Sequence, residues 1–202
     1  MAIKATTLVA GLSFTFTLFT AGQTLAAQDY PTVVVVHVDN HARIPPDQLE
    51  RSGLEVTRIY ERAGIHMIWV EGDGQADPAS TELDGRPAAV HVRVLLLSRD
   101  MAISKIARER IPANVVGRAA GPTGRAYILT HRVAELTARN RWDFDLVLAR
   151  VIAHEVGHLL LPPNSHSTSG IMRETLDISP GRSETFTGAQ RKAMLSALTA
   201  RD

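Results

Sequence analysis

The run of residues from Val151 to Met172 constrains the fold of this chain more than any other segment, because a histidine pair is followed by an abrupt backbone break. His154 and His158 are four residues apart, so on a helix their side chains lie one turn apart on the same face. Pro162 and Pro163 cannot continue a helix, so the chain must turn just after His158. The apolar neighbours of the pair predict that this helix is buried. They are Val151, Ile152, Val156, Leu159, Leu160 and Leu161.

The histidine pair indicates a metal site. Two imidazoles on one helical face can bind one zinc ion, whose catalytic sites take three protein ligands and leave a fourth position to water. Glu155 would lie beside that open position, where its carboxylate can take a proton from a water that the metal polarises. We therefore predict zinc ligation by His154 and His158 and a catalytic base at Glu155. The alternative is a buried helix whose histidines are only hydrogen bonded.

A third metal ligand is predicted at His166. This histidine comes eight residues after His158, on a polar loop that begins at the two prolines and can return to the helix. An oxygen ligand from Glu174, Asp177 or Glu184 is the alternative, and in that case His166 is an exposed loop residue. The other histidines have no partner at metal-ligand spacing and are interpreted as strand or loop residues. They are His37, His41, His66, His91 and His131.

These motifs resemble those of the metzincin clan of zinc endopeptidases, in which HExxH is followed by a glycine turn, a third histidine and a methionine turn beneath the metal. The tetrapeptide Ser169–Met172 is similar to that methionine turn. The glycine of the clan falls here on Leu161 and its third histidine on Asn164, two residues before His166. At the position where several members of the clan carry a tyrosine, this chain has Glu174. The resemblance therefore identifies no residue that would stabilise the oxyanion. It implies hydrolysis of peptide bonds in peptide or protein substrates.

Residues 1–27 are predicted to be a secretory signal peptide. Lys4 supplies a positive start, Leu8 to Thr20 an apolar stretch, and Ala26 and Ala27 a cleavage site. A retained membrane anchor is the alternative, but the apolar stretch is short and is interrupted by polar residues and glycine. We expect a secreted or periplasmic protein with no stable membrane insertion after cleavage.

The composition limits the partners and the means of stabilisation. The chain has 22 Lys and Arg against 21 Asp and Glu, and removal of Lys4 with the leader would leave it formally neutral, so no nucleic-acid partner is expected. The absence of cysteine excludes disulfides, so stability must come from a hydrophobic core. Residues 28–202 are long enough for a single zinc metallopeptidase domain with such a core.

Strands alternate with helices along the chain, which predicts parallel strand pairing. The predicted strands are Thr32 to Val38, His66 to Val70, Val90 to Leu97 and Arg125 to Thr130. Helices are predicted for Pro46 to Ala63, for Ala102 to Glu109, from Asp143 or Asp145 through the zinc segment, and from a Thr187/Gln190 capping box through Ala200. The expected fold class is α/β (α+β). It is a metzincin-like, twisted, mixed and mostly parallel sheet packed with an active-site helix and a C-terminal helix.

A glycine-rich segment and a set of basic residues lie outside the predicted metal site. If the metzincin layout holds, the glycine-rich edge from Val115 to Tyr127 lies along the cleft and binds an extended peptide as an added strand; the alternative is a surface loop. A set of basic residues is interpreted as a solvated helix face. It comprises Arg99, Lys105, Arg108, Arg110 and Arg118.

The sequence therefore predicts a secreted or periplasmic zinc-dependent endopeptidase in which His154, His158 and His166 bind zinc and Glu155 activates the water. The alternative function is a non-catalytic, zinc-stabilised peptide- or protein-binding module with the same fold and a closed metal shell, for example with Glu174 as a fourth ligand. A metal-free exported domain is the third possibility.

Overall fold

The structure is a computed structural model that describes residues 33–72, 90–174 and 185–200. The predicted signal peptide and the alternative ligands Asp177 and Glu184 lie outside the described residues. Within the described ranges, no helix combines the length and the apolar character needed to cross a membrane.

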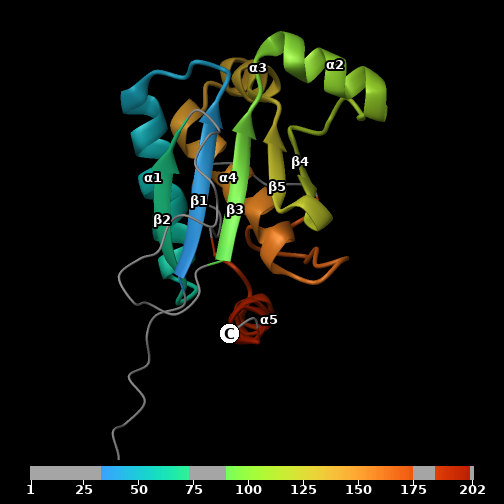
Figure 1. Cartoon of the computed structure of the whole chain (residues 1–202). Coiled ribbons are helices and arrows are strands. Elements are labelled where there is room, and N and C mark those ends of the chain that lie inside the picture. Colours follow the sequence, from blue (N-terminus) through green and yellow to red (C-terminus); the bar gives the residue numbers. More distant parts are fainter. Residues whose placement is uncertain (1–32, 73–89, 175–184, 201–202) are drawn as a thin grey trace, which may run out of the picture.

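Five strands in the described residues form one mixed sheet (Figure 1). They are β1 (Val33–Asn40), β2 (His66–Glu71), β3 (Val90–Leu96), β4 (Gly117–Ala120) and β5 (Arg125–Ile128). Their order is β2-β1-β3-β5-β4, and only the β4–β5 pair is antiparallel. The prediction of a mostly parallel, mixed sheet is confirmed.

The central position of β1 follows from its sequence. Four consecutive valines begin the strand, and β-branched side chains favour the extended backbone. Val34, Val36 and Val38 alternate on one face and belong to the main hydrophobic core. Strand β1 is hydrogen bonded to β2 on one side and β3 on the other, so its backbone groups are satisfied along both edges.

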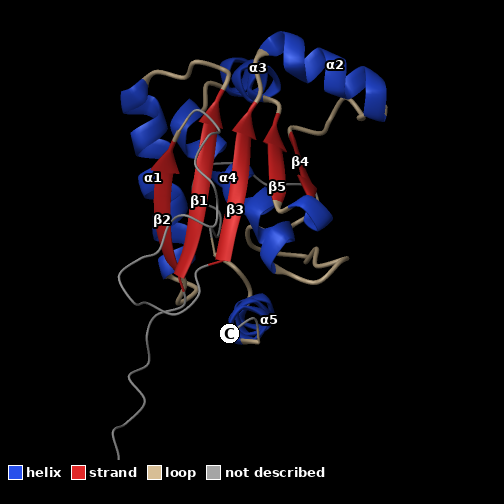
Figure 2. Ribbon diagram, in the orientation of Figure 1, coloured by secondary structure: helices blue, strands red, loops and turns tan. Residues whose placement is uncertain are grey.

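Helices α1 (Pro46–Glu61) and α4 (Phe144–Leu160) pack against each other on one face of the sheet, behind the strands in Figure 2. Helices α2 (Arg99–Glu109) and α3 (Thr130–Asn140) lie at the end of the sheet where β1, β3 and β5 finish. Helix α5 (Gly188–Thr199) lies near the opposite end. Tyr60 of α1 is fully buried and donates a 2.8 Å hydrogen bond to the carbonyl of Ala153, which anchors α4.

Three local predictions are corrected by the structure. The strand expected to reach Thr130 ends at Ile128, because Thr130 begins α3, which was not predicted as a helix. The Thr130 hydroxyl donates to the carbonyl of Leu97 at 2.7 Å, a contact with a distant segment that fixes the start of α3. Helix α2 begins at Arg99, before the predicted Ala102, because the side chain of Ser98 caps it. Arg118 lies on strand β4 and not on a helix face.

Candidate metal centre

Helix α4 carries the histidine pair, and both of its ends are set by local sequence. Asp143 caps the start, and its carboxylate accepts hydrogen bonds from the backbone of Asp145 at 2.9 Å and Leu146 at 3.2 Å. The helix ends at Leu160, just before Pro162. This confirms the expected helix and selects Asp143 over Asp145 as its cap.

The structure brings His154, His158 and His166 together. One potential ligand atom of each lies within 4.8 Å of the others, and among the described residues they form the one group of three or more such side chains. The Nε2 atoms of His154 and His158 are 3.1 Å apart. Nitrogens bound tetrahedrally to one zinc ion would be about 3.3 Å apart. The ring of His166 lies 4.7 Å from that of His158 and 5.5 Å from that of His154, between centroids.

The hydrogen bond of His154 uses Nδ1 and leaves Nε2 free to bind a metal. Its Nδ1 lies 2.8 Å from the carbonyl oxygen of Ile171, which can only accept, so Nδ1 carries the proton and Nε2 has the unshared electron pair. Burial lowers the pKa of His154, and burial together with the charges of the other two histidines lowers the pKa of His158 to about 4. Both rings are therefore neutral near pH 7, which is the form that binds metal.

The segment predicted as a methionine turn packs against α4 between the two histidines. Met172 is fully buried, and a Cβ placed on Gly157 would come within 2.5 Å of its sulfur atom. The glycine between the two histidines therefore leaves room for the methionine. Gly170 has a φ of +78°, and a Cβ there would lie 2.3 Å from the carbonyl oxygen of Thr185, to which Ile171 donates its amide hydrogen at 3.1 Å.

The loop that carries His166 is held by Gln190, which the sequence indicated only as a helix-capping residue. The expected capping box is confirmed: Gln190 accepts from the Thr187 amide at 3.0 Å, and Thr187 accepts from the Gln190 amide at 3.3 Å. The side-chain amide of Gln190 also donates to the Ser165 carbonyl at 2.9 Å and the Ser167 hydroxyl at 3.0 Å. These two serines flank His166, so α5 and the candidate ligand loop share one buried side chain.

Glu155 lies at the junction of α4 and the edge strand β4. Its burial raises its pKa to about 7, while a backbone hydrogen bond from Ala119 and the charge of Arg118 act in the opposite direction. A Cβ on Gly117 would lie 2.6 Å from a carboxylate oxygen of Glu155, so this strand approaches the helix closely only because residue 117 has no side chain. Neither contact was predicted, although the glycine-rich composition of this segment pointed to an irregular edge.

The other candidate residues lie apart from the three histidines. Glu174 is exposed and is not part of the cluster. His37 and His91 instead form a pair on β1 and β3, with Nε2 of the first 2.9 Å from Nδ1 of the second. His131, expected in a strand or loop, lies in the first turn of α3.

Comparison with known proteins finds similarity at the level of solved structures. No protein-family model matches the sequence, and no curated protein matches it significantly. The fold is similar to that of archaemetzincin from Methanopyrus kandleri, with a TM-score of 0.45 and 14% sequence identity over 87% of this chain and 99% of that protein.

Proposed function

We propose that this protein is a zinc-dependent peptidase whose metal is bound by His154, His158 and His166 and whose catalytic base is Glu155. The observation that carries the proposal is the convergence of three imidazole nitrogens within 4.8 Å beside a buried carboxylate. Three histidines are a known ligand set of catalytic zinc. The set leaves a fourth position for water or substrate.

The residues around the cluster fit zinc. The Ile171 carbonyl holds the His154 ring in the tautomer that presents Nε2, as outer hydrogen-bond partners do in zinc sites. Bound zinc would supply Lewis acidity, which polarises the substrate carbonyl and the attacking water. Glu155 would accept the proton of that water and deliver it to the leaving amine, a role suited to a carboxyl group with a pKa of about 7.

Strand β4 offers a surface for the substrate. Among the described strands it is the last in the sheet order and is paired with β5 alone, so an extended peptide can add along its outer edge by backbone hydrogen bonds. The hydrogen bond from Ala119 to Glu155 places this edge next to the proposed base. Recognition through the peptide backbone would tolerate many side chains, which is consistent with an endopeptidase acting on peptides or proteins.

The proposal includes export. Residues 1–27 have the composition of a cleavable signal peptide, so we place the mature protein in the periplasm or outside the cell. Expression of the full chain in a bacterium, followed by N-terminal sequencing of the mature protein, should give a first residue near Gln28. An uncleaved chain in the membrane fraction would show that the segment is an anchor.

The test combines elemental analysis with peptide-library cleavage. The wild type should bind about one zinc per chain and cleave peptides. Glu155→Gln should retain zinc and lower kcat/KM by about 10²–10⁴-fold, because the general base is lost. Full activity in Glu155→Gln would contradict this mechanism.

Two ligand variants complete the test. His158→Ala should lose zinc and cleavage together. His166→Ala should weaken zinc affinity by more than the roughly 10–100-fold typical of an outer-shell partner, because a direct ligand is removed. Stoichiometric zinc in the wild type without any cleavage would favour the zinc-stabilised binding module, and no zinc under loading conditions would overturn the assignment.

A further inference from the structure

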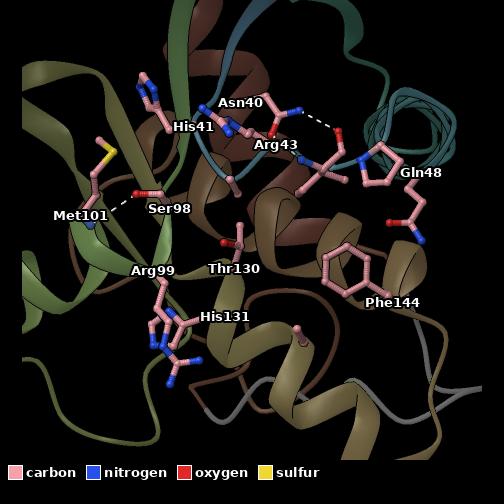
Figure 3. Close-up of a pocket in the computed structure, with 14 residues that line it drawn as sticks. Asn40, His41, Arg43, Gln48, Ser98, Arg99, Met101, Thr130, His131 and Phe144 are labelled. Atoms are coloured by element: carbon pink, nitrogen blue, oxygen red, sulfur yellow. Dashed lines mark hydrogen bonds between the residues drawn. The ribbon is translucent and has the colours of Figure 1, made fainter.

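A hollow lies at the other end of α4 from the histidine cluster. It has a volume of about 990 Å³ and is open to solvent, and it is lined by residues that follow the carboxyl ends of β1 and β3 together with the starts of α3 and α4 (Figure 3). Phe144 lines this crevice, and His154 comes ten residues later on the same helix, roughly 15 Å away along its axis. The crevice is therefore distinct from the proposed metal centre.

The position of the crevice in the sheet is one where α/β proteins bind ligands. Strand β1 connects through α1 to β2 on one side, whereas β3 continues through α2 toward β4 and β5 on the other. The connections thus diverge between the neighbouring strands β1 and β3. The opening beyond the carboxyl ends of two such strands is the usual ligand site of open parallel sheets.

The charged residues of the lining indicate which class of ligand the crevice would bind. Within the described part of the chain, two arginines and two histidines line the crevice and no aspartate or glutamate does, although acidic and basic residues are almost equal in number in the whole sequence. Arg43 and Arg99 are exposed. Arg99 lies 4.0 Å from Glu135 in an ion pair between largely exposed groups, which is therefore weak. Such a lining favours an anion.

The backbone around Arg43 is held in one conformation. Arg43 has a φ of +54°, which is strained for a residue with a side chain. Asn40 closes this turn by donating to the Ile44 carbonyl and accepting from the Ile44 amide, both at 2.9 Å. The arginine is thus presented from a preformed turn.

The rest of the lining adds polar and apolar surface. The charges of Glu135, Arg132 and Arg99 all act on the ring of His131, whose buried Nδ1 has no hydrogen-bond partner among the described residues. The start of α3 lacks a side-chain cap and an acidic residue in its first turn, so its first amides add partial positive charge. Met101 and Phe144 supply apolar surface, which an inorganic ion alone would not cover.

We propose that this crevice binds a small organic anion, whose phosphate or carboxylate group is attracted by the arginines of the lining, Arg43 and Arg99, and whose apolar body contacts Met101 or Phe144. Arginine recognises both kinds of anionic group through paired hydrogen bonds. The proposal does not depend on the metal centre.

The test is a titration of the zinc-loaded protein followed by NMR, with phenyl phosphate, benzoate, inorganic phosphate and benzyl alcohol as probes. Phenyl phosphate or benzoate should shift the backbone amides of Ala42, Ser98 and His131 saturably, and the stronger of the two identifies the preferred anionic group. Inorganic phosphate should bind more weakly, because it lacks the apolar body, and benzyl alcohol should not bind, because it lacks the charge.

Matched variants separate the crevice from other sites. Arg43→Gln combined with Arg99→Gln should weaken binding at least about tenfold, the loss expected for one charge-assisted contact. Arg139→Gln, which removes a cation of α3 that does not line the crevice, should leave it unchanged. Absence of saturable shifts, equal binding in the double variant, or shifts confined to the His154–His158 segment would each overturn the proposal.

Discussion

At the scale of single residues, the position of Glu155 depends on a contact that leaves no room for a methyl group. Gly117 of β4 faces Glu155 so closely that an added Cβ would lie 2.6 Å from a carboxylate oxygen and 2.7 Å from Cγ. Contacts below 3.0 Å force one partner to move. Glu155 is buried, with 7% of its surface exposed, and its position is set by both α4 and β4.

We therefore expect Gly117→Ala to displace the carboxylate of Glu155 and to lower kcat/KM by about 10²-fold, the effect of misplacing a catalytic group by about 1 Å. Zinc content should not change, because the three histidines are on other segments. Gly121→Ala is the matched control, since a Cβ at Gly121 meets nothing within 4 Å. Equal activity of wild type and Gly117→Ala would mean that Glu155 tolerates displacement and is not the base.

At the scale of elements, Gln190 couples the start of α5 to the loop of His166. The same side chain accepts one hydrogen bond within the capping box and donates two to the loop. The residue at this position thus influences both the stability of α5 and the geometry of the proposed third ligand. Ser167 is also fixed from the other side, because its amide donates to the Met172 carbonyl at 2.8 Å.

Two variants separate these roles. Gln190→Met removes the donors to the loop, so zinc affinity should fall about tenfold, as for other groups that orient a ligand. Thr187→Ala removes one half of the capping box but keeps the side chain of Gln190. It should cost about 1 kcal/mol and lower Tm by roughly 2–4 °C, with zinc affinity within about twofold of the wild type.

The measurements are chelator competition for zinc and thermal unfolding of the metal-free protein. A parallel loss of zinc affinity in both variants would show that α5 stability alone controls the loop. If His166→Ala leaves zinc affinity unchanged, His166 is not the third ligand. That result would leave the hydrogen bonds from Gln190 to the loop unaffected.

At the scale of the whole molecule, the sheet has a second face that carries polar side chains. His37 and Asp39 alternate with the core valines of β1 and are buried, and they meet His91 and Arg93 of β3. Burial lowers the pKa of both histidines, and for His37 the charges of His91 and Arg93 lower it further while Asp39 opposes them. The two rings are stacked with centroids 5.3 Å apart, so protonation of both would place two cations in contact.

The lowered pKa values of His37 and His91 predict how the free energy of unfolding changes with pH. Below the ordinary histidine pKa of about 6.5, the unfolded chain binds more protons than the folded one. The free energy of unfolding of the metal-free protein should therefore be fully maintained above about pH 6.5 and should fall as the pH decreases below it. His37→Gln combined with His91→Gln should make this decline less steep.

Denaturant unfolding between pH 7.5 and 5 provides the measurement, and His66→Gln, which removes an exposed histidine of β2, is the control. The other histidines of the chain remain in every variant, so only the difference in slope is compared. The same slope in the double variant as in the wild type would show that the pair does not contribute.

Short-range sequence patterns were enough to predict most elements of the sheet and the helix of the metal centre. The valine run of β1, an aspartate cap at Asp143 or Asp145 and the Thr187/Gln190 box each act over a few residues, and the structure contains all three, with Asp143 as the cap. Helix α3 was missed because its start is fixed by the hydrogen bond from Thr130 to Leu97, 33 residues away. Arg118 was assigned to a helix face because charge spacing alone does not distinguish a strand from a helix.

The sequence by itself determined the pairing of His154 with His158, because a helical repeat of 3.6 residues places positions four apart on one face whatever surrounds them. Only the tertiary structure decided the environment of that pair: His166 held through Gln190, Glu155 enclosed by β4, and the basic crevice at the far end of α4. The physical reason is the distance along the chain over which each interaction acts. Helix geometry and caps are local, whereas ligand loops, burial and crevices depend on contacts between segments that only the folded chain brings together.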